Sequence, residues 1–396
     1  MKSALQSFPP THTAALERLQ SFIPRAGTTY ARLRNFDRDG HPHVSGLSPY
    51  LRHRILSETD VLAATRPRKS GALDDKFVQE VVWRTYWKGW LELRPSIWST
   101  YRAGLNSALN RVQTETGLRQ QWEAACTGGT GIDAFDHWAR ELCNTGYLHN
   151  HARMWFASIW IFTLRLPWEL GADFFLRHLL DGDPASNTLS WRWVAGLHTQ
   201  GKTYLASRDN IAKYTDGRFA PEDLATRAEP LPFRPHPAPR ALPSPVVPAA
   251  DARTLLLVTE EDLSPGWLLR SIPKPAVFAT LSTAAHRSPL AVSETVIEWT
   301  DSAIQDCLDR HNWPDAARLL SGEDLRNLIK TENIEQVITS HLPTGPAHDH
   351  LTSEALGVPL IQMMRPYDRR FWPNATHGFF RFRAVIPEIT ASLPPL

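Results

Sequence analysis

The residues with the clearest chemical potential lie in the segment that begins Asp181-Gly-Asp183. Asn187 follows four residues after Asp183, and Trp191 and Trp193 end the segment. Carboxylates and an amide can bind a polar ligand or a metal, whereas two indoles indicate a core or a stacking surface. By itself an Asp-Gly-Asp run is more often a turn or a helix N-cap than a site.

Two stretches with helical spacing add polar side chains. Glu80, Trp83 and Arg84 share one stretch of an expected helix, where they form either a ligand-facing surface or the border of a core. Asn150 and Arg153 are three residues apart and therefore share a helix face. The simpler alternative for the second pair is a helix cap followed by a solvated ion pair.

A third stretch, around Ser45 and Ser48, precedes Pro49 and an expected helix. Hydroxyls and free amides at a helix N-terminus suit a phosphate, although small residues before a proline are also ordinary loop chemistry.

In their order and spacing, these motifs resemble the flavin-binding domain of the DNA photolyase/cryptochrome family over about residues 10–220. The residues that carry the resemblance are Tyr30, Arg34, Ser45, Leu47, Ser48, Glu80, Trp83, Arg84, Asn150, Arg153, Met154, Trp168, Asp181, Asp183, Asn187, Trp191 and Trp193.

The resemblance implies FAD as the cofactor, and it implies no metal. The cofactor-binding residues that it indicates are Tyr30, Ser45, Leu47, Ser48, Arg84, Asn150, Arg153, Asp181, Asp183 and Asn187. Within this set, it places an Arg153–Asp181 ion pair beside the isoalloxazine and Asn187 opposite flavin N5. A second, antenna chromophore is left open.

The same resemblance implies redox and lesion-binding residues. Trp191 and Trp168 match the first two members of a tryptophan chain that photoreduces FAD, and the third member is open among Trp87, Trp90 and Trp98. Contacts to a flipped pyrimidine dimer and its DNA are implied for Arg34, Glu80, Trp83, Met154 and Trp193. The implied catalytic residues are Glu80, Trp168, Asn187 and Trp191. Two tryptophans suit the flat, apolar face of such a dimer, because aromatic side chains stack on flipped bases.

The expected function is light-driven repair of UV-damaged DNA, a deoxyribodipyrimidine photo-lyase activity in which excited FADH⁻ passes an electron to a cyclobutane pyrimidine dimer. The runner-up is a cryptochrome-like photoreceptor that photoreduces FAD without repair. A third alternative is an interaction module whose flavin site is inactive. The sequence leaves open whether the lesion is a dimer or a pyrimidine–pyrimidone product.

Three features depart from the family pattern. The phosphate loop reads Val44-Ser45-Gly46, with fewer polar contacts than a Thr-Ser-Arg-like run, and the segment after Trp193 is short. The third feature is the domain order, because the expected α/β region follows the flavin domain instead of preceding it. We therefore expect a displaced version of the antenna domain.

The elements that would position these residues form two expected domains. Helical spacing predominates in residues 13–23, 77–93, 132–145, 150–166 and 171–181. After a Pro-rich stretch come short apolar runs, expected as strands at 254–258, 276–281, 296–299, 336–340 and 358–364, which alternate with amphipathic stretches such as 301–312. We therefore expect a helical FAD-binding domain at 1–228, a Pro-rich linker at 229–250, and a doubly wound α/β domain at 251–396 that lacks a Gly-rich nucleotide loop.

Length and composition set the remaining bounds. The 396 residues are 42% hydrophobic and 21% charged, which is typical of a globular protein and excludes a disordered one. Residues 1–228 hold 28 Lys and Arg against 22 Asp and Glu, and a mildly basic half is compatible with nucleic acid. Three cysteines without a CxxC spacing exclude a disulfide framework and a zinc-finger pattern. With no signal peptide or membrane-length apolar run in view, we expect a cytoplasmic monomer with UV-damaged DNA as its partner and no membrane contact.

Overall fold

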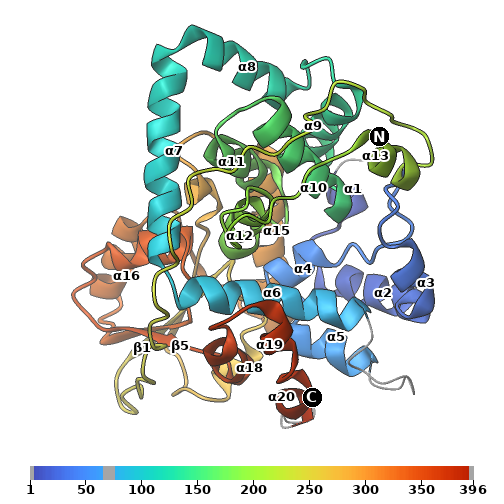
Figure 1. The fold of residues 1–396 in the computed structure, drawn as a ribbon. Helices are drawn as coiled ribbons and strands as arrows, with labels where there is room; N and C mark the ends of the chain where they lie inside the picture. The colour runs from blue at the N-terminus through green and yellow to red at the C-terminus, as the bar shows by residue number, and fades with distance from the viewer. Residues whose placement is uncertain (1–3, 66–75, 392–396) are drawn as a thin grey trace.

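The computed structural model describes residues 4–65 and 76–391 and divides them into a helical part and a sheet covered by helices (Figure 1). The helical part contains α1 (Ala4–Ser7), α2 (His12–Phe22), η1 (Ile23–Arg25), α3 (Thr28–Leu33), α4 (Ser48–Arg52), α5 (Glu58–Thr65), α6 (Lys76–Glu92), α7 (Ser96–Thr114), α8 (Thr116–Thr127), α9 (Asp133–Thr145), α10 (Asn150–Ser158), η2 (Ile159–Thr163), α11 (Trp168–His178), α12 (Pro184–Val194) and α13 (Arg208–Tyr214).

Most of the expected helices are present near their expected positions. The helices at 77–93 and 132–145 are confirmed within one residue as α6 and α9. The expected helix at 150–166 is shorter, because α10 continues into the π-helical turn η2 and ends there. Helices α7 and α8 were not expected, although the buried Trp98, Tyr101, Leu105 and Val112 of α7 follow helical spacing.

A parallel five-stranded sheet forms the core of the second part, which confirms the expected α/β class. Its strands are β1 (Thr254–Thr259), β2 (Val277–Leu281), β3 (Ala317–Leu319), β4 (Gln336–Ser340) and β5 (Leu360–Met363), in the order β3-β2-β1-β4-β5. In the register, Leu256 lies opposite Phe278 on β2 and Ile338 on β4. The helices of this part are α14 (Gly266–Leu269), η3 (Ala284–Arg287), α15 (Glu294–His311), α16 (Gly322–Thr331) and α17 (Pro346–Thr352).

One expected strand is wrong. Residues 296–299 lie inside α15, because Val296, Trp299, Ala303 and Cys307 repeat every three or four residues and bury one face of a helix. The third strand of the sheet is instead β3, a three-residue edge strand too short to give a pattern in the sequence.

The last described helices return to the helical part of the molecule. They are α18 (Pro366–Phe371), η4 (Trp372–Asn374), α19 (Phe379–Arg383) and α20 (Ile386–Ala391), and Figure 1 shows α18 and α19 below α6. Their apolar side chains share one buried core with α6, α7 and α10 to α12. A Cβ on Gly89 of α6 would lie 2.8 Å from the Trp372 ring, so glycine permits this close approach. The expected division at 229–250 stays a prediction, because this core runs across it.

The Pro-rich segment lies against the helical part along much of its length (Figure 1). Arg240 donates from its backbone to Leu93, and His236 contacts the backbone oxygen of His198 at 2.8 Å. These contacts fix a segment without regular secondary structure onto the helical core, so it serves as a wall as well as a connection.

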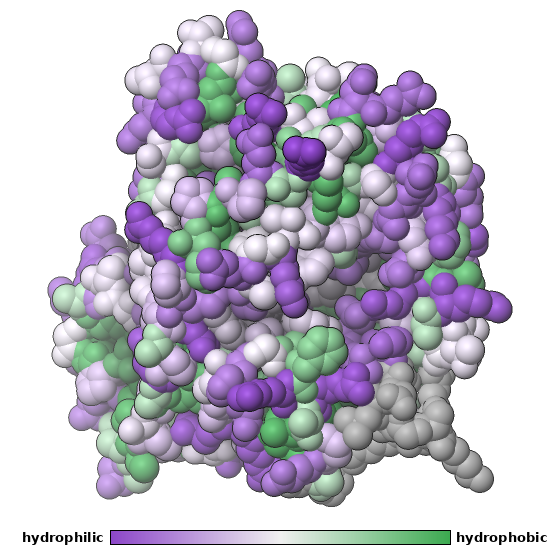
Figure 2. Space-filling view, in the orientation of Figure 1, coloured by the Kyte–Doolittle hydropathy of each residue, from purple (hydrophilic) through white to green (hydrophobic). Residues whose placement is uncertain are grey.

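The face shown in Figure 2 is mostly hydrophilic, with apolar side chains in small scattered patches. Among the residues that the structure describes, no helix has the length and apolar character needed to cross a membrane.

Candidate functional site

A stripe of charged side chains runs along α6, an otherwise largely buried helix. Glu80, Arg84, Lys88 and Glu92 are four residues apart, so they lie on one face. Lys88 and Glu92 are buried, and Glu80 and Arg84 are partly buried. Burial of charge is costly unless it is paired, so the partners of this stripe define the candidate site.

The centre of the stripe faces the start of α12. Lys88 Nζ lies 3.1 Å from Asp183 Oδ1, and Asp183 Oδ2 accepts a hydrogen bond of 2.9 Å from the backbone of Ser186 as the N-cap of α12. Pro184 follows at the first helical position, where it fits best. Burial raises the pKa of Asp183, but the neighbouring cations outweigh burial and hold this pKa well below its usual range. Asp183 is therefore a buried, permanently charged carboxylate.

Arg84 lies near the carboxylates of Asp183 and Asp181, but its guanidinium group is not fully hydrogen-bonded. Its Nε and Nη2 atoms are buried and have no hydrogen-bond partner in the described part of the chain. Burial lowers the pKa of Arg84, while the charges of Asp183 and Asp181 oppose that effect. One oxygen of Asp181, Oδ1, is also buried and unpartnered there.

The α/β part closes this site from the other side. Arg52 at the end of α4 donates to Gly182 O at 2.9 Å and to Glu261 Oε1 at 2.6 Å. Glu261 lies two residues after the end of β1 and is also 3.6 Å from Lys88. Arg287 of η3 donates to Leu179 O at 3.1 Å.

The crevice beyond the carboxyl ends of β1 and β4 is therefore filled by side chains of the helical part. Such a crevice, at the point where the strand order reverses, is the usual ligand site of a doubly wound sheet. Glu92 of α6 accepts a hydrogen bond of 2.9 Å from the backbone of Thr344 and lies 3.4 Å from His341, just after β4. Here the crevice serves as an interface between the two parts of the chain.

The expected Arg153–Asp181 ion pair is present. Arg153 Nη2 donates to Asp181 Oδ2 at 2.9 Å, and Arg153 Nε donates to Leu148 O. Asn187 is buried one turn into α12, and its Nδ2 donates to Ala172 O at 2.7 Å. This bond uses one N–H of the amide and fixes its orientation, so the carbonyl oxygen and the second N–H are left to face a ligand.

Trp191 lies in a dry aromatic environment. It is 2% exposed and packs edge-on against Phe175 and Trp160, with ring centroids 5.1 and 6.2 Å away. A Cβ on Gly171 of α11 would lie 2.3 Å from its ring, so that glycine admits the indole. Its Nε1 has no acceptor in the described residues.

Trp168, at the start of α11, connects to a second aromatic series. Its ring centroid lies 5.7 Å from Tyr101, which lies 5.2 Å from Trp98. Trp98 Nε1 donates to Asp349 Oδ2 at 2.8 Å. Trp87 and Trp90 instead contact His198. No ring contact joins Trp168 to Trp191 within the described chain.

The expected lesion residues are occupied by partners from the chain itself. Arg34 and Glu80 form an ion pair, and Arg34 also lies over Tyr30 at 5.9 Å. Trp83 is covered by Phe379 of α19, with ring centroids 3.6 Å apart and an angle of 11° between the planes. Glu80 and Trp83 have their expected location on α6, but Phe379 covers a flat face of the Trp83 ring.

Other expected residues lie apart from this cluster. Asn150 is exposed at the start of α10, Met154 is half-buried on the same helix, and Trp193 stacks on Tyr204 at 5.8 Å. In the loop before α4, Ser45 Oγ accepts from the backbone of Leu47 at 3.3 Å, and Ser48 begins α4. The roles expected for these residues stay predictions.

The sequence interpretation missed Lys88, Arg52 and Glu261. The four-residue repeat of charges in α6 was a usable signal for Lys88, because charges at that spacing inside an apolar helix demand buried partners. Glu261 and Phe379 gave no local signal, since their partners lie far away in the chain.

Comparison with known proteins finds sequence similarity to DNA photolyases. Residues 77–217 match the family model of the FAD-binding domain of DNA photolyase. A deoxyribodipyrimidine photo-lyase of Streptomyces griseus is 35% identical over 41% of this chain and 35% of its own length. The enzyme of the same name from Agrobacterium fabrum is 33% identical over 47% of this chain and 38% of its own length. A bacterial class III photolyase from Agrobacterium tumefaciens, a solved structure, is 28% identical and covers 53% of this chain and 45% of that one, with a TM-score of 0.43.

The fold and site thus define a photolyase-type FAD-binding domain joined to a parallel α/β domain. Residues 77–217 of this chain are similar to the FAD-binding domain of DNA photolyase. The chain spans less than half the length of each of these relatives.

The residues present fit the expected FAD. The unpartnered nitrogens of Arg84 suit an anionic group, such as a pyrophosphate. The Arg153–Asp181 pair and the free oxygen of Asn187 suit the polar edge of a flavin. No cluster of three or more metal-ligating side chains occurs among the described residues.

Proposed function

We propose that this protein is a light-driven, FAD-dependent enzyme that repairs UV-damaged DNA, with the cyclobutane pyrimidine dimer as its substrate. The observation that carries the proposal is the buried site around Asp181, where Arg84 keeps two unpartnered nitrogens beside a formed Arg153–Asp181 pair. Curated relatives named deoxyribodipyrimidine photo-lyase support it. When bound, FAD would supply the absorption of light and the electron given to the lesion.

The chain's own residues would bind, orient and shield this chemistry. Arg84 would hold the pyrophosphate, and Asn187 and the Arg153–Asp181 pair would orient the flavin ring. Glu80 is the candidate acid or hydrogen-bond donor for the lesion, once Arg34 turns from Glu80 to the DNA backbone. Because these residues are already buried or half-buried, bound DNA would exclude the remaining water from them and so strengthen their electrostatic contacts.

Trp98 is our candidate for the third tryptophan, in preference to Trp87 and Trp90. It contacts Tyr101, which contacts Trp168. Oxidised Trp191 would lack a nearby proton acceptor and would pass the positive charge outward. At Trp98 the Asp349 carboxylate would stabilise that charge and accept the proton.

The test is repair of an oligonucleotide with one cyclobutane dimer, under blue light with reductant, beside an oligonucleotide with one pyrimidine–pyrimidone lesion. We expect a yellow protein that restores only the dimer substrate. Trp191→Phe should slow photoreduction yet retain repair after chemical reduction, and Trp313→Phe in the α/β part is the matched control. Restoration of only the pyrimidine–pyrimidone substrate would overturn the assigned lesion, and a protein that cannot bind FAD would overturn the whole proposal.

One observation favours a second candidate function, a cryptochrome-like photoreceptor. Phe379 covers Trp83, and Glu80 is paired with Arg34, so the lesion residues are engaged within the chain. A protein that binds and photoreduces FAD but leaves both lesions unchanged would establish this alternative.

A further inference from the structure

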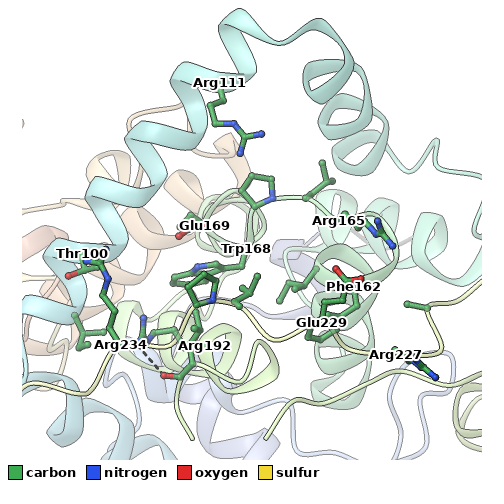
Figure 3. A pocket seen from close by; sticks show the side chains of 18 of the residues that line it. Thr100, Arg111, Phe162, Arg165, Trp168, Glu169, Arg192, Arg227, Glu229 and Arg234 are labelled. Carbon is green, nitrogen blue, oxygen red and sulfur yellow. Dashed lines mark hydrogen bonds between the residues drawn. The ribbon is translucent and has the colours of Figure 1, made fainter. Parts of the chain in front are cut away.

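A groove on the outer side of α11 lies apart from the FAD residues and is lined by an unusual number of arginines. Its cavity volume is about 980 Å³, at the upper end for small-molecule sites. Figure 3 shows Trp168 at its centre, with Arg111, Arg165, Arg192 and Arg234 around it.

The floor of the groove is aromatic and apolar. Trp168 and Phe162 are both largely buried, at 7% and 6% exposure, and both line the cavity. The π-helical turn η2 contributes Phe162 to this floor and ends two residues before Arg165, a non-glycine residue with φ of 56°. Such π-helical turns and strained backbones concentrate at functional sites.

The rim of the groove is cationic. Four exposed arginines, Arg111, Arg165, Arg227 and Arg234, line it, against two carboxylates, Glu169 and Glu229. Arg165, Arg227 and Arg234 form no hydrogen bond or ion pair within the described part of the chain. This excess of positive charge indicates an anionic ligand.

A buried arginine also faces the groove. Arg192 is 8% exposed, donates from Nη2 to Leu197 O at 3.1 Å and keeps Nε without a partner in the described residues. Its guanidinium lies 6.0 Å from the Trp168 ring centroid. A buried unpartnered donor beside an aromatic floor is a preformed polar contact for a ligand.

The outer wall of the groove is fixed in place. It consists of the start of the Pro-rich segment and the residues just before it, where Ala225 donates from its backbone to Thr163 Oγ1 at 3.1 Å. Arg94 donates to Pro237 O at 3.2 Å, at the other end of the same wall. The groove therefore exists before a ligand binds, which lowers the entropic cost of binding.

We propose that this groove is a second ligand site for a planar aromatic anion, such as a mononucleotide or a flavin phosphate. The ring would lie over the apolar floor with its phosphate against Arg234, while Arg165, on the other side of Trp168, would add a second cationic contact (Figure 3). The crevice of the α/β part is occupied by Lys88 and Glu92, whereas this groove has open volume for a small ligand.

Flavin mononucleotide is the probe, titrated by calorimetry into the full chain that has first been saturated with FAD. We expect one additional binding event, at least about tenfold stronger than that of riboflavin, which has the same ring without the phosphate. Binding should weaken as salt rises, because the contacts are partly solvent-exposed.

Arg234→Ala and Arg165→Asn should each weaken binding of the mononucleotide about fivefold to tenfold, since each removes one charged contact. Asparagine is chosen at position 165 because it tolerates a positive φ. Arg119→Ala, which removes an exposed arginine of α8 outside the groove, is the control and should leave binding unchanged.

Absence of a second binding event, or equal weakening by all three variants, would overturn the proposal. Displacement of the mononucleotide by a single-stranded oligonucleotide at equal phosphate concentration would overturn its small-molecule assignment. The groove variants leave the FAD residues intact. Failure here with FAD bound contradicts only this site, whereas failure to bind FAD contradicts the proposed function.

Discussion

Replacement of Asp183 by asparagine tests whether the buried charges, and not only the helix cap, stabilise the site. Asparagine caps a helix as well as aspartate does, so the bond to Ser186 can persist while the negative charge is lost. Lys88 then loses its 3.1 Å partner and keeps only the more distant Glu261, 3.6 Å away. Removal of one partner of a buried ion pair costs about 3–5 kcal/mol.

That cost can be read as a change in melting temperature. The unfolding entropy of a 396-residue protein is about 0.8 kcal/mol/K, so a loss of 3–5 kcal/mol corresponds to about 4–6 °C. The measurement is thermal unfolding followed by circular dichroism and by scanning calorimetry, on protein with and without FAD. Two probes are needed because a chain of this size can unfold in more than one step.

Two variants make the interpretation specific. Ser321→Ala removes the N-cap of α16, away from the site, and should cost only about 1 kcal/mol. Lys88→Met with Asp183→Asn should cost less than the sum of the two single changes, because the double variant leaves no lone charge in this pair. If Asp183→Asn lowers the melting temperature by no more than Ser321→Ala does, our account of the buried ion pair is wrong.

Three further predictions follow from other contacts. Trp98→Phe should slow photoreduction of bound FAD in a transient-absorption measurement while Trp87→Phe does not; equal effects would remove Trp98 from the electron path. Burial lowers the pKa of His41, but two neighbouring carboxylates outweigh this effect and raise the pKa from an ordinary 6.5 to about 9. Protonated His41 therefore stabilises the folded protein fully below pH 6.5, and this stabilisation is lost as pH rises through 9. The melting temperature should therefore fall between pH 6.5 and pH 9.5, and less so in His41→Gln; equal slopes would contradict this. Phe379→Leu should uncover Trp83 and strengthen binding of dimer-containing DNA severalfold in a fluorescence anisotropy titration, with Phe380→Leu, which is 85% exposed, as the control; unchanged affinity would show that the stacked ring does not limit access.

The sequence predicted those features whose signal is local. Continuous apolar runs marked β1 and β4, and the spacing between Asp181 and Arg153 carried a family resemblance that the ion pair fits. The run at 296–299 misled because a run this short, with three apolar residues in four, suits a strand or a helix equally well.

Contacts between distant residues were beyond such reasoning. The Phe379–Trp83 stack joins positions almost 300 residues apart, and no pattern near either residue indicates the other. The same holds for Arg52 and Glu261, whose pairing depends on how the sheet docks on the helices. Physical chemistry states that a buried charge needs a partner, but only the packed chain identifies it.

Helices α18, α19 and α20 come late in the sequence but pack against the helical part around α6, and this order has a consequence for synthesis on the ribosome. Gly89 of α6 packs against Trp372, so roughly 280 residues must be added before that face of α6 is covered. At about 5–20 residues per second, the apolar side of α6 stays exposed for about 15–60 seconds. During that interval the nascent chain offers a surface for chaperones, and faster translation or a cooler host should change the soluble yield of this protein.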